Sequence, residues 1–107
     1  MIRIQLYKNG FEIIGHANPK ICGEVSILAW SYAQTIYRLD QLSKYYTSKN
    51  DDNPKRYNDG YTYMIFDNNN TCARWMYEEY IINLKEWAEV MWKDEVIIGE
   101  VKENLIK

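Results

Sequence analysis

The chain has 107 residues, of which 47% are hydrophobic and 26% charged, with a formal net charge of -2 and a pI of about 5.4. This length predicts a single domain over residues 1–107 with one modest hydrophobic core. The lack of a basic excess argues against a nucleic-acid partner, and no apolar run approaches the roughly 20 residues that cross a membrane.

The N-terminal residues alternate between apolar and polar side chains, which is typical of a strand and not of a signal peptide. We therefore expect a cytoplasmic protein. A second alternating run follows Asn9-Gly10, a pair that favours a type I′ turn because both residues can adopt positive φ. Strands are expected at about residues 1–8 and 11–17, joined as a hairpin.

A long helix is expected at about residues 20–45. Asn18 suits an N-cap and Pro19 suits the first helical turn, and apolar residues then recur at helical spacing. Residues 46–59 are polar and rich in turn formers, which predicts a solvated loop.

The second half of the chain repeats this alternation of strand and helix. We expect a strand at about residues 61–66, a helix at about residues 72–93 capped by Asn70 or Thr71, and a last strand at about residues 96–101. The predicted order is β-β-α-β-α-β. It corresponds to an α+β fold, a two-layer α/β arrangement with a mixed or antiparallel sheet and two helices packed on one face.

Two residues of the first half could carry thiolate chemistry. Cys22 lies in the first turn of the expected helix, where unpaired N–H groups and the helix dipole favour a thiolate. The only histidine, His16, ends the preceding strand, and its imidazole could take the thiol proton. Ser26, one turn after Cys22, could orient the imidazole or bond a preceding carbonyl. The backbone N–H groups of Cys22 and Gly23 are natural donors to an oxyanion.

Each of these residues also has a simpler interpretation. A free cysteine is usually a small buried hydrophobe, and a single histidine is more often structural than catalytic. Cys72 also lies near an expected helix start, but no histidine is near it in sequence, so we interpret it as structural. In a cytoplasmic protein both cysteines are expected to be free thiols. Two cysteines and one histidine are too few for a closed zinc site unless carboxylates help, so no metal or cofactor is predicted.

Around these residues the chain resembles the ribosomal-processing cysteine proteases called Prp, also known as YsxB-like proteins, of Firmicutes and their phages. Residues 15–17 (Gly-His-Ala) match the motif that ends the family's second strand. Residues 22–26 (Cys-Gly-Glu-Val-Ser) match Cys-Ala-Ala-Val-Ser at the family's helix start at the Cys, Val and Ser. The match covers roughly residues 11–36. The family's loop between the motifs is about twice as long as the five residues here and carries a glycine and an acidic residue.

The resemblance implies a cysteine endopeptidase with Cys22 as nucleophile, His16 as general base and later acid, and Ser26 as an auxiliary residue. Family members remove a short N-terminal extension from a large-subunit ribosomal protein, and phage capsid and scaffold proteins are also cleaved. We therefore expect a divergent member, encoded by a phage or prophage, that acts on a protein or peptide substrate. Family members form homodimers, which suits the surplus of 10 Tyr and 4 Trp over 2 Phe.

Two other hypotheses stay open. The shortened loop also fits a Prp-fold homodimer with impaired catalysis that serves as a peptide-binding or interaction module. The third is a small α/β dimer of unrelated function, in which the two motifs coincide by chance.

Overall fold

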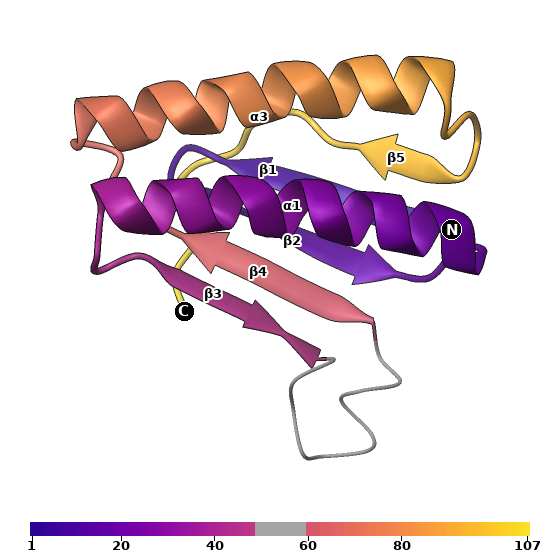
Figure 1. The fold of residues 1–107 in the computed structure, drawn as a ribbon, viewed down its shortest axis with the longest axis horizontal. Helices are drawn as coiled ribbons and strands as arrows, with labels where there is room; N and C mark the ends of the chain where they lie inside the picture. Colours follow the sequence, from indigo (N-terminus) through magenta and orange to yellow (C-terminus); the bar gives the residue numbers. More distant parts are fainter. Residues whose placement is uncertain (49–59) are drawn as a thin grey trace.

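The computed structural model describes residues 1–48 and 60–107. In chain order its elements are β1 (Ile2–Tyr7), β2 (Gly10–Gly15), α1 (Pro19–Leu39), β3 (Lys44–Thr47), β4 (Tyr61–Ile65), α3 (Thr71–Val90) and β5 (Val96–Ile98). The strands form one five-stranded sheet of order β3-β4-β2-β1-β5. Both helices lie on the same face of this sheet (Figure 1). β1 and β5 are parallel and the other neighbours antiparallel, so the predicted α+β class with a mixed sheet is confirmed.

The predicted hairpin is confirmed, but its turn is displaced by one residue. Tyr7 pairs with Gly10, so the two turn residues are Lys8 and Asn9, and neither has a positive φ. The predicted type I′ turn at Asn9-Gly10 is therefore wrong. Gly10 instead begins β2, where a Cβ would lie 1.8 Å from the carbonyl oxygen of Met64 on β4. Glycine is needed there for the close approach of two strands.

Helix α1 begins where the sequence predicts and ends earlier. The Asn18 side chain accepts the N–H of Ile21, which caps the first turn. The helix stops at Leu39, although apolar spacing continues toward residue 45. Asp40 ends it, because its buried carboxylate accepts the N–H of Asp67 at 2.8 Å, next to β4.

Strand β3 corrects the predicted order, which becomes β-β-α-β-β-α-β. The chain turns back after Asp40, and Lys44–Thr47 pairs antiparallel with β4. Most of the predicted loop, residues 49–59, lies outside the described residues. The second helix starts as predicted, with the Asn70 side chain accepting the N–H of Ala73 at 3.0 Å.

The hydrophobic core lies between the sheet and the two helices. Its largest fully buried side chains come from both layers: Trp92, Tyr80, Phe11, Ile2, Ile4, Leu6, Ile36, Met64, Leu84 and Val25. Burying an apolar side chain of this size contributes roughly 1.5–3 kcal/mol before conformational entropy is subtracted, so these residues hold α1 and α3 on the sheet. In the part of the chain that the structure describes, neither helix is long and apolar enough to cross a bilayer.

Candidate active site

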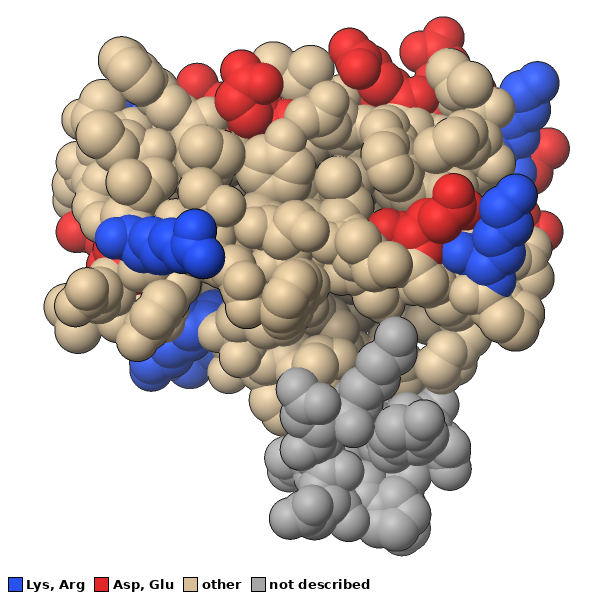
Figure 2. Space-filling view, viewed as in Figure 1, with Lys and Arg blue, Asp and Glu red and all other residues tan. Residues whose placement is uncertain are grey.

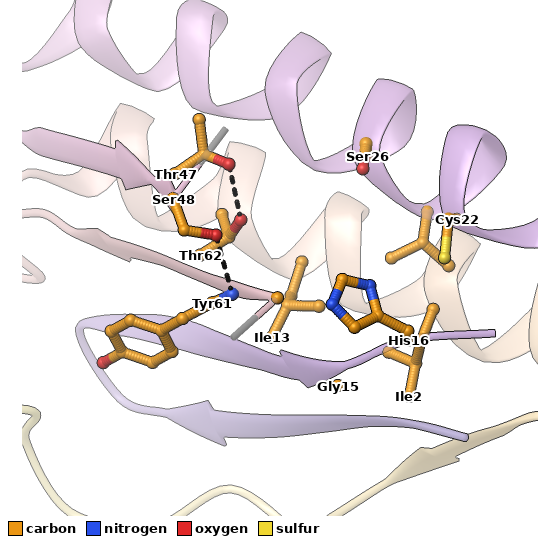
Figure 3. Close-up of a pocket in the computed structure, with 12 residues that line it drawn as sticks. Ile2, Ile13, Gly15, His16, Cys22, Ser26, Thr47, Ser48, Tyr61 and Thr62 are labelled. Atoms are coloured by element: carbon orange, nitrogen blue, oxygen red, sulfur yellow. Dashed lines mark hydrogen bonds between the residues drawn. The ribbon is translucent and has the colours of Figure 1, made fainter. Parts of the chain in front are cut away.

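A pocket of about 270 Å³ opens on the helix-covered side of the sheet, where β2 ends and α1 begins. Its walls are Ile2, Ile13, Gly15, His16, Cys22, Val25, Ser26, Thr47, Ser48, Gly60, Tyr61 and Thr62. The three side chains predicted for catalysis, those of His16, Cys22 and Ser26, all line this one pocket. Figure 3 shows the His16 ring toward the middle of the pocket, with Cys22 and Ser26 on the first turns of α1.

His16 directly follows the last residue of β2 and rests against Gly60, the residue before β4. The N–H of Gly15 donates to the Gly60 carbonyl at 2.9 Å, which ties the two strand ends together. Gly60 has φ +61°, and a Cβ there would lie 2.6 Å from Nε2 of His16. Only glycine combines this backbone conformation with space for the imidazole. The sequence analysis missed this role, although Asp59-Gly60 marks a turn before a strand.

Cys22 is half-buried and its sulfur turns toward the end of β2. Its Sγ lies 3.2 Å from the amide nitrogen of Ala17, which donates to it, and 3.3 Å from the Ala17 carbonyl oxygen, to which the thiol can donate. Only Ala17 and Asn18 separate His16 from α1, because the other three residues of the five-residue link form the first helical turn. The short link therefore keeps the thiol beside the backbone of Ala17, the residue that follows His16.

The backbone N–H of Cys22 is already engaged. It donates to the carbonyl of the capping residue Asn18 at 3.0 Å, as the first regular bond of the helix. In this conformation the N–H is used within the helix, and its part as an oxyanion donor stays a prediction. Gly23, the fifth residue of α1, is not among the residues that line the pocket, and its N–H likewise stays a predicted donor.

The other side of the pocket carries hydroxyl groups from β3 and β4. The hydroxyl of Ser48 accepts the N–H of Tyr61 at 3.1 Å, and the hydroxyl of Thr62 donates to that of Thr47 at 3.0 Å (Figure 3). These residues give the pocket a neutral, polar wall away from the thiol. Sequence reasoning missed this wall because it placed the start of the 46–59 segment in a loop.

Tyr61 is held from the opposite face of the sheet. The Glu12 carboxylate accepts hydrogen bonds from the hydroxyls of Tyr7, at 2.6 Å, and Tyr61, and lies 3.6 Å from the ammonium of Lys107. Burial alone would raise the pKa of Glu12, but the hydroxyl donors and Lys107 outweigh it and the pKa is lowered. The bond to Glu12, with burial, raises the pKa of Tyr7 to about 12. Glu12 thus holds a residue whose backbone borders the pocket.

Both cysteines are free thiols, as predicted. Cys72 is exposed at the second residue of α3 and is not among the residues that line the candidate site. Within residues 1–48 and 60–107, no three or more His, Cys, Asp or Glu side chains gather in a way that could hold a metal ion.

No family model matches the sequence, and no curated protein matches it. Among solved structures, the essential ribosomal processing protease Prp from S. aureus in complex with a covalently linked product peptide aligns with a TM-score of 0.66 and 16% identity, over 96% of this chain and 97% of that one. The same protease in complex with a substrate peptide aligns with a TM-score of 0.64 and 12% identity, over 94% and 97% of the two chains. The likeness thus spans nearly the whole of both chains. The chain described here has the fold of the ribosomal processing protease Prp.

Proposed function

We propose that the chain is a Prp-like cysteine endopeptidase. The observation that carries the proposal is the meeting of His16 and Cys22 in one pocket, at the end of β2 and the start of α1. The fold is shared with a protease that forms a covalent complex with a product peptide. A thiol, an imidazole and an adjoining pocket are the minimum that peptide-bond hydrolysis by a cysteine requires.

In the proposed mechanism the His16 imidazole takes the proton of the Cys22 thiol. The thiolate attacks the carbonyl carbon of the scissile peptide bond and forms a tetrahedral oxyanion. When this collapses, the C–N bond breaks, His16 gives its proton to the leaving amine, and a thioester to Cys22 remains. Water, deprotonated by His16, then hydrolyses the thioester and returns the free thiol.

Two neighbours of the pair assist in this scheme. Ser26 stands one helical turn after Cys22 and acts as an auxiliary residue that orients the imidazole. The Ala17 N–H, 3.2 Å from Sγ, is placed to stabilise negative charge that forms at the sulfur or beside it. It is therefore the proposed donor to the oxyanion in this conformation, and the N–H groups of Cys22 and Gly23 would join it only where the first turn of α1 opens.

The proposed substrate is an N-terminal extension of a ribosomal protein or a phage structural protein, cleaved in the cytoplasm. Its support is the ribosomal processing role of the protease whose fold the chain shares. We further propose a homodimer. Apolar side chains on the outer surfaces of the helices favour self-association, since Ile27 is 67% exposed, Trp75 63% and Ile82 51%. Sedimentation velocity of the wild type against Ile82→Glu tests this proposal.

The experiment that tests the protease assignment compares the wild type with Cys22→Ala and Cys72→Ala on a peptide with the family's cleavage sequence. Cys22→Ala is expected to abolish cleavage, whereas Cys72→Ala retains it. Mass spectrometry of the wild type quenched during turnover should find a mass increase equal to the acyl fragment on Cys22. Equal cleavage by the wild type and Cys22→Ala would rule out the assignment.

One observation favours a second candidate, a catalytically impaired Prp-fold dimer that binds peptides. The Cys22 sulfur is bonded to both the N–H and the carbonyl of Ala17, so the thiol is partly sequestered by its own backbone. The alkylation rate of Cys22 near neutral pH separates the two functions. A rate no higher than that of a model thiol and independent of His16 favours the binding module.

A further inference from the structure

A second cluster of polar and aromatic side chains lies on the face of the sheet opposite α1 and α3. Glu12 of β2 pairs with Tyr63 of β4, and because side chains alternate along a strand, both point away from the helices. Their neighbours Phe11 and Met64 are buried in the core. Tyr61 lies two residues before Tyr63, and Figure 3 shows its ring turned away from the candidate active site. The cluster therefore faces away from that pocket.

The centre of the cluster is the Glu12 carboxylate, whose side chain is only 15% exposed. The hydroxyls of Tyr7, at 2.6 Å, and of Tyr61 both donate to its oxygens. A carboxylate can accept about four hydrogen bonds, so two donors fix its orientation and leave room for a cation. The acidic side chains of the other face differ, since Figure 2 shows them mostly along α3 at the top of the helix-covered face. Those of that helix are all exposed: Glu78, Glu79, Glu86 and Glu89.

A cation is already seated beside this carboxylate. The ammonium nitrogen of Lys107 lies 3.6 Å from Oε2 of Glu12, 5.0 Å from the centre of the Tyr61 ring and 5.6 Å from that of Tyr63. Both ring distances are within the range of cation–π attraction. Tyr46 stacks on Tyr63 with ring centres 5.4 Å apart and so supports the second ring. The Tyr61 hydroxyl, together with Glu12, raises the pKa of Lys107 above its ordinary value of 10.5, so these surroundings favour the charged ammonium.

The segment that carries Lys107 is anchored before it reaches the cluster. The N–H and the carbonyl of Leu105 both bond the Asn9 side chain, at 2.7 and 3.0 Å. Beyond this anchor Ile106 is 89% exposed, and the Lys107 side chain is 35% exposed. An ion pair of 3.6 Å with a partly exposed lysine is weak. The ammonium group can therefore leave the cluster while Leu105 keeps the segment in place.

We propose that Glu12, Tyr61 and Tyr63 form a binding site for the ammonium group of a lysine, and that a lysine of a protein partner exchanges with Lys107 there. The carboxylate supplies the opposite charge, and the two rings supply cation–π attraction and cover the methylene groups of the lysine. We call these three residues the ammonium site. Because it lies on the sheet face away from Cys22, the inference goes beyond the proposed function and does not depend on it.

The tethered lysine decides which partners can enter. A group on a short tether acts at an effective concentration of about millimolar or more, so Lys107 keeps single free lysines out of the site. A partner must add contacts of its own beside the lysine. Ile14 offers such a contact, since it lies on the same face two residues after Glu12 and is 43% exposed. The expected partner is therefore a peptide segment with a lysine next to apolar side chains.

The first test empties the site without changing the residues that form it. The Lys107→Ala protein, with isotope-labelled tyrosine rings, is titrated by NMR with N-acetyl-lysine methylamide. N-acetyl-norleucine methylamide is the uncharged control with the same carbon chain. The lysine compound should shift the ring signals of Tyr61 and Tyr63 and bind at least about tenfold more tightly than the norleucine compound. The wild type should bind it at least about tenfold more weakly than Lys107→Ala does, because Lys107 fills the site. The matched control Lys85→Ala removes the same charge from the exposed surface of α3 and should behave like the wild type.

Two further variants test the residues of the site itself. Glu12→Gln/Lys107→Ala keeps both rings and should bind the lysine compound no more tightly than the norleucine compound. Tyr63→Leu/Lys107→Ala keeps the carboxylate with both of its hydroxyl donors and should bind the lysine compound about threefold or more weakly than Lys107→Ala. The amide spectrum of each variant shows whether it is folded.

Exchange with a partner is tested on the wild type. A short peptide with a lysine between two isoleucines should move the side-chain signal of Lys107 to the position of a lysine in solvent, whereas the same peptide with norleucine should not. An unchanged Lys107 signal would overturn the exchange. Equal binding of the lysine and norleucine compounds to Lys107→Ala, or lysine binding that survives Glu12→Gln, would overturn the site.

A second copy of the chain is the other possible occupant of this sheet face. If Glu12→Gln dissociated a dimer in sedimentation velocity, the face would hold a second copy and the proposal would be overturned. None of these measurements uses peptide cleavage. Failure of the ammonium site would therefore leave the protease assignment intact, and an inactive Cys22 would leave the ammonium site intact.

Discussion

Cys22 and Cys72 occupy similar local positions and have different surroundings. Each follows an asparagine whose side chain caps a helix, Asn18 for α1 and Asn70 for α3. Yet Cys22 is half-buried, is hydrogen-bonded to the backbone of Ala17, and lines a pocket with His16, whereas Cys72 is exposed and lies outside that pocket.

A helix N-terminus does not by itself make a site. A cap and a first turn are local features, and both cysteines have them. What distinguishes Cys22 is that His16 directly follows the strand before α1 and that strands β3 and β4 add walls to the same pocket. Substitutions in and around the two helix starts test this distinction.

The largest effect is expected for His16→Ala. Removal of the proposed general base should lower peptide cleavage by about 10²–10⁴-fold. Iodoacetamide labelling of the two cysteines, resolved by mass spectrometry, should slow at Cys22 and stay unchanged at Cys72. If the labelling rate is unchanged at both cysteines, His16 is not the cause of any difference in their reactivity.

The second largest effect is expected for Gly60→Ala. The left-handed backbone at Gly60 alone costs a residue with a side chain about 1–3 kcal/mol, and the new Cβ would press on the His16 ring and the Gly15 carbonyl. We expect a lower midpoint of urea unfolding together with loss of cleavage. The iodoacetamide labelling rate of Cys72 in the folded protein should be unchanged.

Gly23→Ala is the matched control for stability, because a Cβ at Gly23 would meet no atom within 4 Å and the residue lies in a helix. It should stabilise the protein by about 0.5–1 kcal/mol. A stability loss as large as that of Gly60→Ala would contradict the assigned difference between the two glycines.

Glu12→Gln should remove about 1–2 kcal/mol of stability at neutral pH, since it weakens two hydrogen bonds to a charged acceptor. The folded-state pKa of Glu12 lies below its ordinary value of 4.5. The carboxylate therefore stabilises the fold above that value, and its contribution is lost as the pH falls through the lowered pKa. Urea unfolding from pH 7 to pH 3 should show the wild type and variant converging in acid. A constant difference over this range would exclude the carboxylate as its source.

The smallest effects are expected for the two caps. Asn18→Ala and Asn70→Ala should each cost about 1 kcal/mol of stability in thermal unfolding. Only Asn18→Ala should also reduce cleavage, because it loosens the turn that holds Cys22 against Ala17. Equal cleavage by the two variants would show that the cap of α1 has no special part in the site.

Features that depend on neighbouring residues could be predicted from the sequence alone. Alternation gave the hairpin, and Asn18 and Asn70 marked the helix starts because a cap bonds a backbone N–H three residues ahead. The Gly-His-Ala and Cys-x-x-x-Ser motifs placed His16 and Cys22 near one another, since only five residues link them.

Features that depend on contacts between residues distant in sequence emerged only from the fold. The end of α1 and the turn into β3 depend on Asp40 bonding the N–H of Asp67, which no local pattern reveals. Gly60 meets His16 only because β4 pairs with β2, and that pairing also carries the hydroxyl wall into the pocket. Local hydrogen bonds can be predicted from spacing along the chain, but the pocket depends on strand order, which is set by the burial of the whole core.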